Sequence, residues 1–294
     1  MKKNRLIFTL VSLLCIGLGS GSPARGHGNT RPVKKGILLV AFGTSIPEAQ
    51  AAFQNIEKRV RAAYPGIPVR WAYTSSFIRK KMARQGQYLD SPEIALAKMM
   101  DEGFTHAAVQ SLHIIGGKEF HDLTRNAHAF ADMAGGFERV LVGYPLLGTE
   151  EDLRRVADAI IKHIPKGRKK TDAVVLMGHG SSHPSNAFYA AMMYHFQRKD
   201  PNIFVGTVKG APEIEDIKDM LIRKKIKRAY LMPLMSVAGD HARNDMAGDD
   251  EDSWKSILTK AGIECVPILK GAAEYDEIVD IWVDHLGGIL SHFD

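Results

Sequence analysis

The sequence predicts an α/β fold made of two similar halves, each built on a mostly parallel β-sheet. An apolar run over residues 36–41 leads to Gly43, and a matching run over residues 173–178 leads to Gly180, as is typical of buried parallel strands. Apolar runs also alternate with amphipathic stretches along the chain, as they do in βαβ units. Because matching segments recur in the same order, we expect two α/β domains related by internal duplication.

The expected elements follow one plan in both halves. Strands are predicted over residues 36–41, 69–74, 106–112 and 139–144 of the first half, and over 173–178, 203–208, 228–234 and 263–268 of the second. Helical periodicity predicts helices over 47–63, 94–102, 123–133 and 152–164, and then over 185–198, 213–224, 252–261 and 273–290. We place the boundary near Gly148, which gives domains over residues 33–148 and 149–294.

The first 24 residues have the layout of a secretory signal peptide. Basic residues at positions 2, 3 and 5 precede a mostly apolar stretch over residues 6–19, and small residues follow up to Ala24. We expect cleavage near Ala24 and export to the periplasm. No later stretch approaches the length of about 18 apolar residues that a spanning helix needs, so we expect no membrane insertion after cleavage.

Net charge and cysteine content argue against a nucleic-acid partner and against an intrachain disulfide bond. The formal net charge of +6 falls to about +3 when the three basic residues of the leader are set aside, so bulk charge does not indicate a nucleic-acid partner. Cys15 lies in the leader, which leaves Cys265 without a partner for an intrachain disulfide bond.

Candidate metal ligands distinguish the second half from the first. Matching positions hold Phe42, Glu93 and Glu119 in the first half and His179, Glu213 and His241 in the second. Each member of the second set follows a different strand, so we expect the three side chains to meet at the carboxyl edge of one sheet. Two neutral imidazoles and a carboxylate suit Co²⁺, Fe²⁺, Ni²⁺ or Zn²⁺, and three protein ligands leave coordination positions open. An ordinary helix start at Pro212 would also explain Glu213.

The sequence lacks the motifs of several cofactor-dependent classes. It contains no His-Glu-x-x-His, which a zinc protease helix would carry, and no Gly-x-x-x-x-Gly-Lys-Ser/Thr for binding ATP. No Gly-x-Gly-x-x-Gly follows a predicted strand, so a dinucleotide site is not indicated. We therefore expect neither ATP nor NAD as a cofactor.

A basic insertion lengthens the first half. Gly43 and Pro92 are 49 residues apart, whereas their counterparts Gly180 and Pro212 are 32 apart. The surplus includes four basic residues, which are Arg79, Lys80, Lys81 and Arg84. One interpretation is a solvated surface helix, and the other is a face that contacts an anionic substrate.

Five motifs carry a resemblance to a known family. They are residues 38–45 (LLVAFGTS), 112–115 (LHII), 176–181 (LMGHGS), 209–213 (KGAPE) and 233–241 (PLMSVAGDH). Over about residues 35–290 the chain resembles the anaerobic sirohydrochlorin cobaltochelatases of the class II chelatase group, relatives of ferrochelatase. The resemblance implies two flavodoxin-like, three-layer domains facing each other across a cleft. In that cleft a planar tetrapyrrole would receive Co²⁺, with Fe²⁺ as a second candidate metal, without ATP.

The resemblance also implies roles for individual residues. The metal-binding histidines of the family map to His179 and His241, and its active-site glutamate maps to Glu213. Insertion of a metal requires removal of pyrrole N–H protons, and we expect His179 to act as the general base. Sirohydrochlorin is rich in carboxylates, which gives the basic insertion a partner.

The predicted leader favours a second hypothesis. Tetrapyrrole precursors of this kind are made in the cytoplasm, so an exported chelatase lacks an obvious supply of substrate. The alternative is a periplasmic metal or haem carrier that reuses the chelatase cleft. A carrier would bind its ligand stoichiometrically and would produce no metallated tetrapyrrole.

Three histidines of the first half, His113, His121 and His128, lie within sixteen residues of one another. In one interpretation His113 lines the cleft or is hydrogen-bonded, and the other two are solvated. In the other, His121 ligates a metal or a haem iron at an auxiliary site between the subunits of a homo-oligomer, because one helix face supplies too few ligands by itself.

Overall fold

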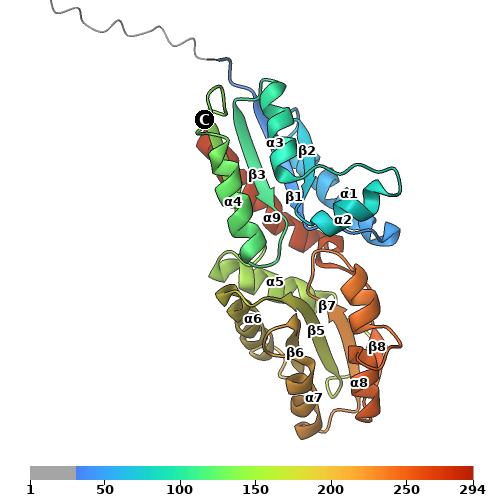
Figure 1. Ribbon diagram of the computed structural model, residues 1–294. Helices are drawn as coiled ribbons and strands as arrows, with labels where there is room; N and C mark the ends of the chain where they lie inside the picture. The colour runs from blue at the N-terminus through green and yellow to red at the C-terminus, as the bar shows by residue number, and fades with distance from the viewer. Residues whose placement is uncertain (1–30, 294) are drawn as a thin grey trace, which may run out of the picture. The chain divides into compact units, whose positions relative to one another are not determined.

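The computed structural model describes residues 31–293, so the predicted leader over residues 1–24 lies outside the described residues. From Val33 onward the chain contains two four-stranded parallel sheets (Figure 1). The first sheet contains β1 (Lys35–Ala41), β2 (Val69–Tyr73), β3 (His106–Ser111) and β4 (Arg139–Gly143). The second contains β5 (Ala173–Gly180), β6 (Ile203–Lys209), β7 (Arg228–Pro233) and β8 (Glu264–Pro267).

The two sheets share one strand order, which is β2-β1-β3-β4 in the first and β6-β5-β7-β8 in the second. All neighbouring strands pair in parallel. The predicted fold class is therefore confirmed, and the repeated order agrees with an internal duplication. Both sheets are of the open α/β type, in which ligands bind beyond the carboxyl ends of the strands.

The first half has three layers, a sheet with helices on both faces, because successive apolar side chains of β1 pack on opposite faces of the sheet. Ile37 and Leu39 pack with α1 (Pro47–Ala63) and α9 (Asp276–Leu290), whereas Leu38 and Val40 pack against α3 (Pro92–Asp101) and α4 (Lys118–Ala129). Successive side chains of a strand point to opposite faces, so a run of apolar residues buries both faces of the sheet.

The second half repeats this arrangement. Along β5, Val174 and Leu176 share a core with α6 (Ala187–Gln197), and Val175 and Met177 pack against the opposite layer. That opposite layer consists of α7 (Ile214–Arg223) and α8 (Trp254–Lys260). The remaining long helix, α5 (Glu150–Lys162), contacts both α6 and α9.

The C-terminal helix α9 crosses between the halves. It belongs to the second half by sequence, yet it packs against β3, β4 and α1 of the first half as well as against α5 (Figure 1). One hydrophobic cluster consequently includes side chains of α1, α5, α6 and α9. The boundary near Gly148 stays a prediction, and it does not divide the described chain into two independent cores.

Several helix ends differ from the prediction. Helix α4 begins at Lys118 instead of residue 123, because Gly117 forms its N-cap and its first turn is polar. Helix α9 begins at Asp276 instead of residue 273, because Ala272–Glu274 forms a separate 3₁₀ turn. The basic insertion forms a helix of its own, α2 (Ser76–Ala83). Among the described residues, no helix has the length and apolar character required to span a bilayer.

Candidate functional site

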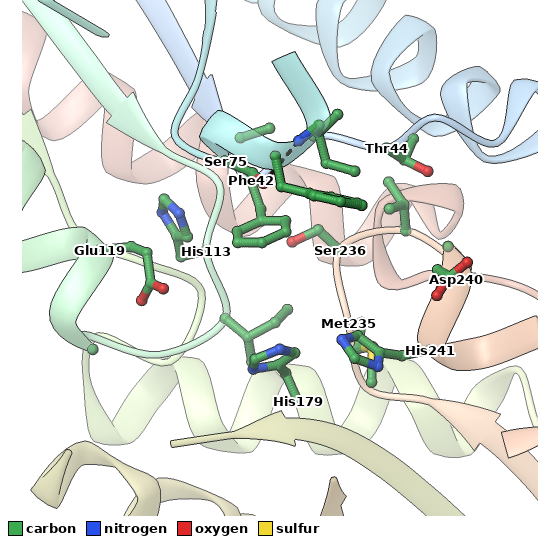
Figure 2. A pocket seen from close by; sticks show the side chains of 18 of the residues that line it. Phe42, Thr44, Ser75, His113, Glu119, His179, Met235, Ser236, Asp240 and His241 are labelled. Atoms are coloured by element: carbon green, nitrogen blue, oxygen red, sulfur yellow. Dashed lines mark hydrogen bonds between the residues drawn. The ribbon is translucent and has the colours of Figure 1, made fainter. Parts of the chain in front are cut away.

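A cavity of about 460 Å³ lies between the two sheets and is lined from both (Figure 2). Its walls come largely from the segments at the carboxyl ends of four strands. These segments are residues 42–45 after β1, residues from 113–119 after β3, residues 179–181 at the end of β5, and residues from 235–241 after β7. The position of the cavity is the one expected for the ligand site of an open α/β sheet.

Two of the predicted ligands, His179 and His241, meet in this cavity. His179 is the penultimate residue of β5, and His241 lies in the segment that follows β7. The centroids of their rings are 4.9 Å apart, with the ring planes at 70°. The duplicated fold therefore brings the two imidazoles together from neighbouring strands of one sheet.

Hydrogen bonds fix the same tautomer in both rings. The Nδ1 atom of His179 lies 3.0 Å from the carbonyl oxygen of Gly180, and the Nδ1 atom of His241 contacts the carboxylate of Asp245. Both partners can only accept a hydrogen bond, so Nδ1 is the protonated nitrogen in each ring. The Nε2 lone pairs are left free, as a pair of neutral metal-ligating imidazoles requires.

The environment of His179 favours the neutral ring. Burial lowers the pKa of His179, and the nearby charges of His241 and Lys209 lower it further. The hydrogen bond to the carbonyl of Gly180 and the charge of Glu119 act in the opposite direction. Because the burial effect is the largest, the ring is neutral and able to bind a metal at neutral pH.

Glu213 does not reach the cavity, which corrects the expectation that three ligands converge. It is an exposed residue at the start of α7, where its backbone N–H donates to the carboxylate of Asp216 at 3.0 Å. The preceding turn folds back onto β6, because the N–H of Thr207 donates to the carbonyl of Pro212 at 2.7 Å. In addition, β6 is an edge strand, and β5 separates it from the strand that leads to His241.

Two other carboxylates line the cavity instead. Glu119, in the first turn of α4, comes from the first half, and its charge acts on the pKa of both His113 and His179. Asp240 directly precedes His241 and accepts a hydrogen bond from Asn244 at 3.0 Å. In Figure 2, Glu119 and Asp240 lie on different sides of the cavity. Comparison of the two halves in sequence identifies Glu119 as the counterpart of His241, but it does not indicate that Glu119 lines the cavity.

The described part of the chain places no third protein ligand beside the two histidines. Within residues 31–293, no group of three or more His, Cys, Asp or Glu side chains is arranged to hold a metal ion. A cation bound by His179 and His241 would therefore keep several coordination positions open. An arrangement of this kind suits a metal that is delivered and released.

His113 is a hydrogen-bonded residue of the cavity wall. Its Nδ1 lies 2.9 Å from Ser111 Oγ, and its Nε2 lies 3.3 Å from Thr74 Oγ1. Burial lowers the pKa of His113 to about 4, although the charge of Glu119 opposes this shift. His113 is therefore neutral at physiological pH. It agrees with the interpretation that it lines the cleft and is hydrogen-bonded.

The four basic residues of the insertion separate into different environments. Lys81 lines the cavity, whereas Lys80 and Arg84 are exposed and lie outside it. Arg79 donates to the carbonyl oxygens of Tyr73 and Thr74, at 2.7 and 3.0 Å, and so fixes α2 to the end of β2. Of the predicted substrate contacts, only Lys81 is positioned to meet a ligand in the cavity.

His121 is exposed on α4 and lies outside the cavity wall. Its ring is 5.0 Å from that of His183, which belongs to the second half. The Nδ1 atom of His183 accepts the N–H of Ser185 at 3.2 Å, so its Nε2 carries the proton in the neutral ring. Of these two rings, His121 is the better candidate for a further metal ligand.

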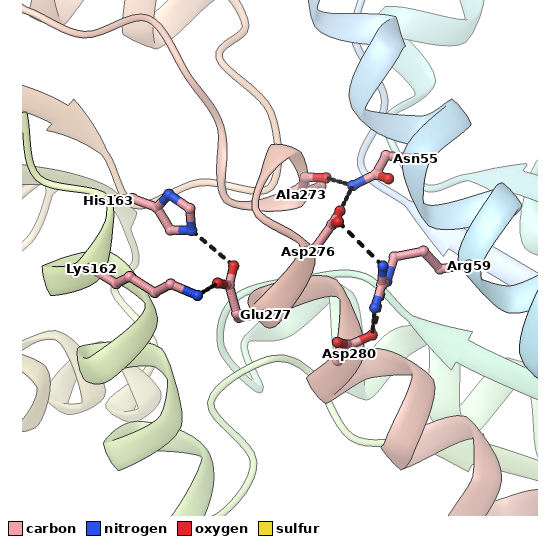
Figure 3. Close-up of polar contacts among 8 residues, drawn as sticks. All are labelled: Asn55, Arg59, Lys162, His163, Ala273, Asp276, Glu277 and Asp280. Atoms are coloured by element: carbon pink, nitrogen blue, oxygen red, sulfur yellow. Dashed lines mark hydrogen bonds and ion pairs between the residues drawn. The ribbon is translucent and has the colours of Figure 1, made fainter.

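Helix α9 holds the two halves around the cavity with ion pairs on both sides (Figure 3). On one side, Arg59 of α1 donates to Asp280 at 2.8 Å. On the other, Glu277 contacts Lys162 and lies 2.8 Å from the Nε2 atom of His163, both at the end of α5. The relative position of the two sheets, and hence the shape of the cavity, depends on this helix.

Two duplicated parallel sheets, with a pair of histidines at the carboxyl end of the second, define an α/β protein of the class II chelatase type. The family described as cobalt chelatase (CbiK) matches residues 35–290, and the chain belongs to this family. This match confirms the resemblance carried by the five sequence motifs.

Individual relatives agree with this assignment. The chain is 45% identical over 261 residues to the sirohydrochlorin cobaltochelatase CbiKC of Nitratidesulfovibrio vulgaris, covering 89% of this chain and 92% of the relative. It is 38% identical to the sirohydrochlorin cobaltochelatase of Salmonella typhimurium, covering 88% and 97%. The structure of SirB from Bacillus subtilis with Fe³⁺ has a similar fold, with a TM-score of 0.58, 15% identity and coverage of 89% and 99%.

Proposed function

We propose that this protein inserts Co²⁺ into sirohydrochlorin without ATP. The observation that carries the proposal is the pairing of His179 and His241, whose rings lie 4.9 Å apart in a cavity between the two sheets. The relatives named as sirohydrochlorin cobaltochelatases support the choice of metal and tetrapyrrole. Both metal and tetrapyrrole are substrates in this reaction.

The proposed chemistry exchanges protons for a metal ion. The cation first binds the Nε2 lone pairs of His179 and His241 and then moves to the nitrogens of the macrocycle. Each imidazole that releases the cation regains a lone pair, which can accept a pyrrole proton. The charge of Glu119 raises the pKa of His179 and would stabilise the imidazolium that forms there. In this scheme His179 is both a metal ligand and the general base.

Purified protein tests the proposal directly when it is incubated with sirohydrochlorin and excess Co²⁺ while the absorption spectrum is followed. We expect many equivalents of cobalt-sirohydrochlorin per protein molecule. Spectral changes that stop at one equivalent would contradict the enzyme and support a carrier.

We propose Fe²⁺ as a second metal substrate. Imidazole nitrogens bind several divalent first-row metals, and affinity alone does not separate Fe²⁺ from Co²⁺ strongly. The same assay with Fe²⁺ under anaerobic conditions should yield a metallated product. A complete lack of product with Fe²⁺, when Co²⁺ is inserted, would limit the reaction to cobalt.

We also propose that the protein is exported to the periplasm. The support is the basic, apolar and small-residue layout of residues 1–24. Cell fractionation with an antibody to the mature chain should place the protein in the periplasm, and N-terminal sequencing should find cleavage near Ala24. Recovery of the uncleaved chain from the cytoplasm would overturn this proposal.

As a second function we propose that His121 binds haem iron, in a homo-oligomer where a second subunit completes the site. The specific support is the exposure of His121 and the hydrogen bond that occupies Nδ1 of its neighbour His183. Haem added to the protein should give a Soret band that His121→Ala removes, without loss of cobalt insertion. His128→Ala, on the same helix, is the matched control. A band that survives in His121→Ala excludes this ligand.

A further inference from the structure

Among the described residues of the second half, no helix matches α2. Three residues of α2 line the cavity, and two of them, Phe77 and Lys81, are not buried. Phe77 and Lys81 both line the cavity wall. They are four residues apart on the helix, so they lie on the same face about one turn from each other. The insertion thus adds an aromatic ring and a cation at one place in the cavity.

The rest of α2 is anchored, which fixes the direction of this face. Ile78 and Met82 are buried, at 9% and 2% exposure, and the methyl group of Ile78 lies close to Gly43 at the end of β1. Ser75 Oγ accepts the N–H of Ile78 at 3.2 Å and caps the first turn. Together with the Arg79 contacts to β2, these interactions fix the helix and therefore the face from which Phe77 and Lys81 project.

Phe77 is exposed to an extent that packing does not explain. Its exposure is 71%, although its neighbour Ile78 is buried in the same turn. A second phenyl ring in the cavity, that of Phe42, is 46% exposed. Single exposed apolar residues are common on proteins, but two such rings in one cavity indicate a site for an apolar ligand. Flat aromatic rings pack well against a planar conjugated ligand.

Lys81 is available to pair with a ligand. Among residues 31–293, its ammonium group has no hydrogen-bond or ion-pair partner, whereas Lys98 and Lys118 are paired with Asp90 and Asp122. A cation on the same face as an exposed phenyl ring complements a ligand that has an apolar plane and an acidic edge.

We propose that α2 is the substrate-recognition element of this chelatase, in which Phe77 packs against the macrocycle and Lys81 pairs with a peripheral carboxylate. This inference rests on the proposed function, because it takes a carboxylate-bearing tetrapyrrole as the ligand. Phe77 and Lys81 then determine affinity and selectivity for the tetrapyrrole, while the histidines carry the metal chemistry.

Binding of metal-free sirohydrochlorin tests this inference separately from catalysis. Titration followed by the absorption spectrum should show a Kd about tenfold higher for Phe77→Ala, and Phe77→Trp should restore binding. Lys81→Met keeps the length of the side chain and removes the charge. It should raise Kd about threefold to tenfold at low salt and less at high salt, with Lys81→Arg restoring binding.

Matched controls come from the same region. Tyr88 is 85% exposed but does not line the cavity, and Lys80 precedes Lys81 and also lies outside it. Tyr88→Ala and Lys80→Met should leave Kd unchanged. In turnover assays the cavity variants should raise KM more than they lower kcat.

The possible failures can be told apart. Unchanged Kd in both Phe77→Ala and Lys81→Met, or equal effects in the controls, would overturn the role of α2 while leaving the proposed reaction standing. Binding of sirohydrochlorin without metal insertion would overturn the proposed reaction alone. If the unmodified protein did not bind sirohydrochlorin, both would be overturned. Phe77 is exposed and Lys81 is partly exposed, so both variants should melt at the temperature of the unmodified protein.

Discussion

The rings of Phe42 and His179 lie across the cavity from each other, with their centroids 6.3 Å apart, and they occupy matching positions in the two halves. Each ring precedes a glycine with positive φ, Gly43 at 104° and Gly180 at 74°. The same backbone turn therefore presents an apolar ring from one half and a metal ligand from the other. The first half therefore contributes an apolar surface to the cavity, and the second half contributes a metal ligand.

Removing either imidazole of the pair should abolish most metal insertion. We expect His179→Ala and His241→Ala each to lower kcat for cobalt insertion by about 100-fold or more, because the remaining ring supplies a single ligand. Thermal melting should change little, since both side chains are partly exposed. His128→Ala serves as a control on an exposed histidine. Near-normal turnover in either variant of the pair would refute the proposed site.

The two glutamates should respond differently to loss of charge. Glu213→Gln should leave cobalt insertion within about twofold of normal, because Glu213 lies at an exposed helix start outside the cavity. Glu119→Gln should lower kcat about tenfold or more, because Glu119 is a carboxylate of the cavity wall near His179. The reverse ranking in a spectrophotometric assay would restore the triad first expected from the sequence.

The charge of Glu119 should also be visible in the titration of His179. Burial lowers the pKa of His179, so in the metal-free protein the ring should protonate below the ordinary value of 6.5. Glu119 raises this pKa, and Glu119→Gln should therefore lower it further. NMR titration of the imidazole signals measures both values. A pKa of His179 that rises in the variant would contradict the geometry.

The ion pairs of α9 predict a loss of stability in acid. Contacts from Lys162 and His163 lower the pKa of Glu277 from 4.5 to about 2. A folded-state pKa below the unfolded value stabilises the fold above about pH 4.5, and this contribution is lost as the pH falls toward 2. Urea unfolding should show that Glu277→Gln destabilises the protein at pH 7 and has little effect near pH 2.

A matched variant controls for the general effect of removing a carboxylate. Glu251, which pairs with Lys260 at 3.7 Å, has a side chain that is 93% exposed. Glu251→Gln should leave unfolding nearly unchanged at both pH values, as exposed ion pairs contribute little. Equal losses at pH 7 in the two variants would show that the α9 contacts have no special effect.

The glycine before His179 should tolerate no side chain. A Cβ atom at Gly178 would lie 2.3 Å from the ring of Tyr189, which is itself buried. Gly178→Ala should therefore destabilise the fold by about 1–3 kcal/mol through overpacking. Gly167→Ala is the control, since its Cβ would have no atom within 4 Å. Thermal or urea unfolding that ranks both variants alike would contradict this packing.

Local patterns in the sequence predicted much of this protein. Eight strands, the repeated order of elements and the pairing of His179 with His241 followed from apolar runs and from the comparison of the two halves. These features were predictable because a buried strand needs a continuous apolar run and its carboxyl end has a fixed place in an open sheet. The five motifs also identified the family.

Only the tertiary structure decided which other side chains share the cavity. Glu213 resembles a ligand in sequence, but the turn after β6 directs it to an exposed helix start, while Glu119 and Lys81 reach the cavity from the first half. Likewise, nothing in the sequence of α9 indicates that it packs on the first sheet. Periodicity reports which face of an element is buried, whereas convergence across two sheets depends on loop paths and on packing between distant segments.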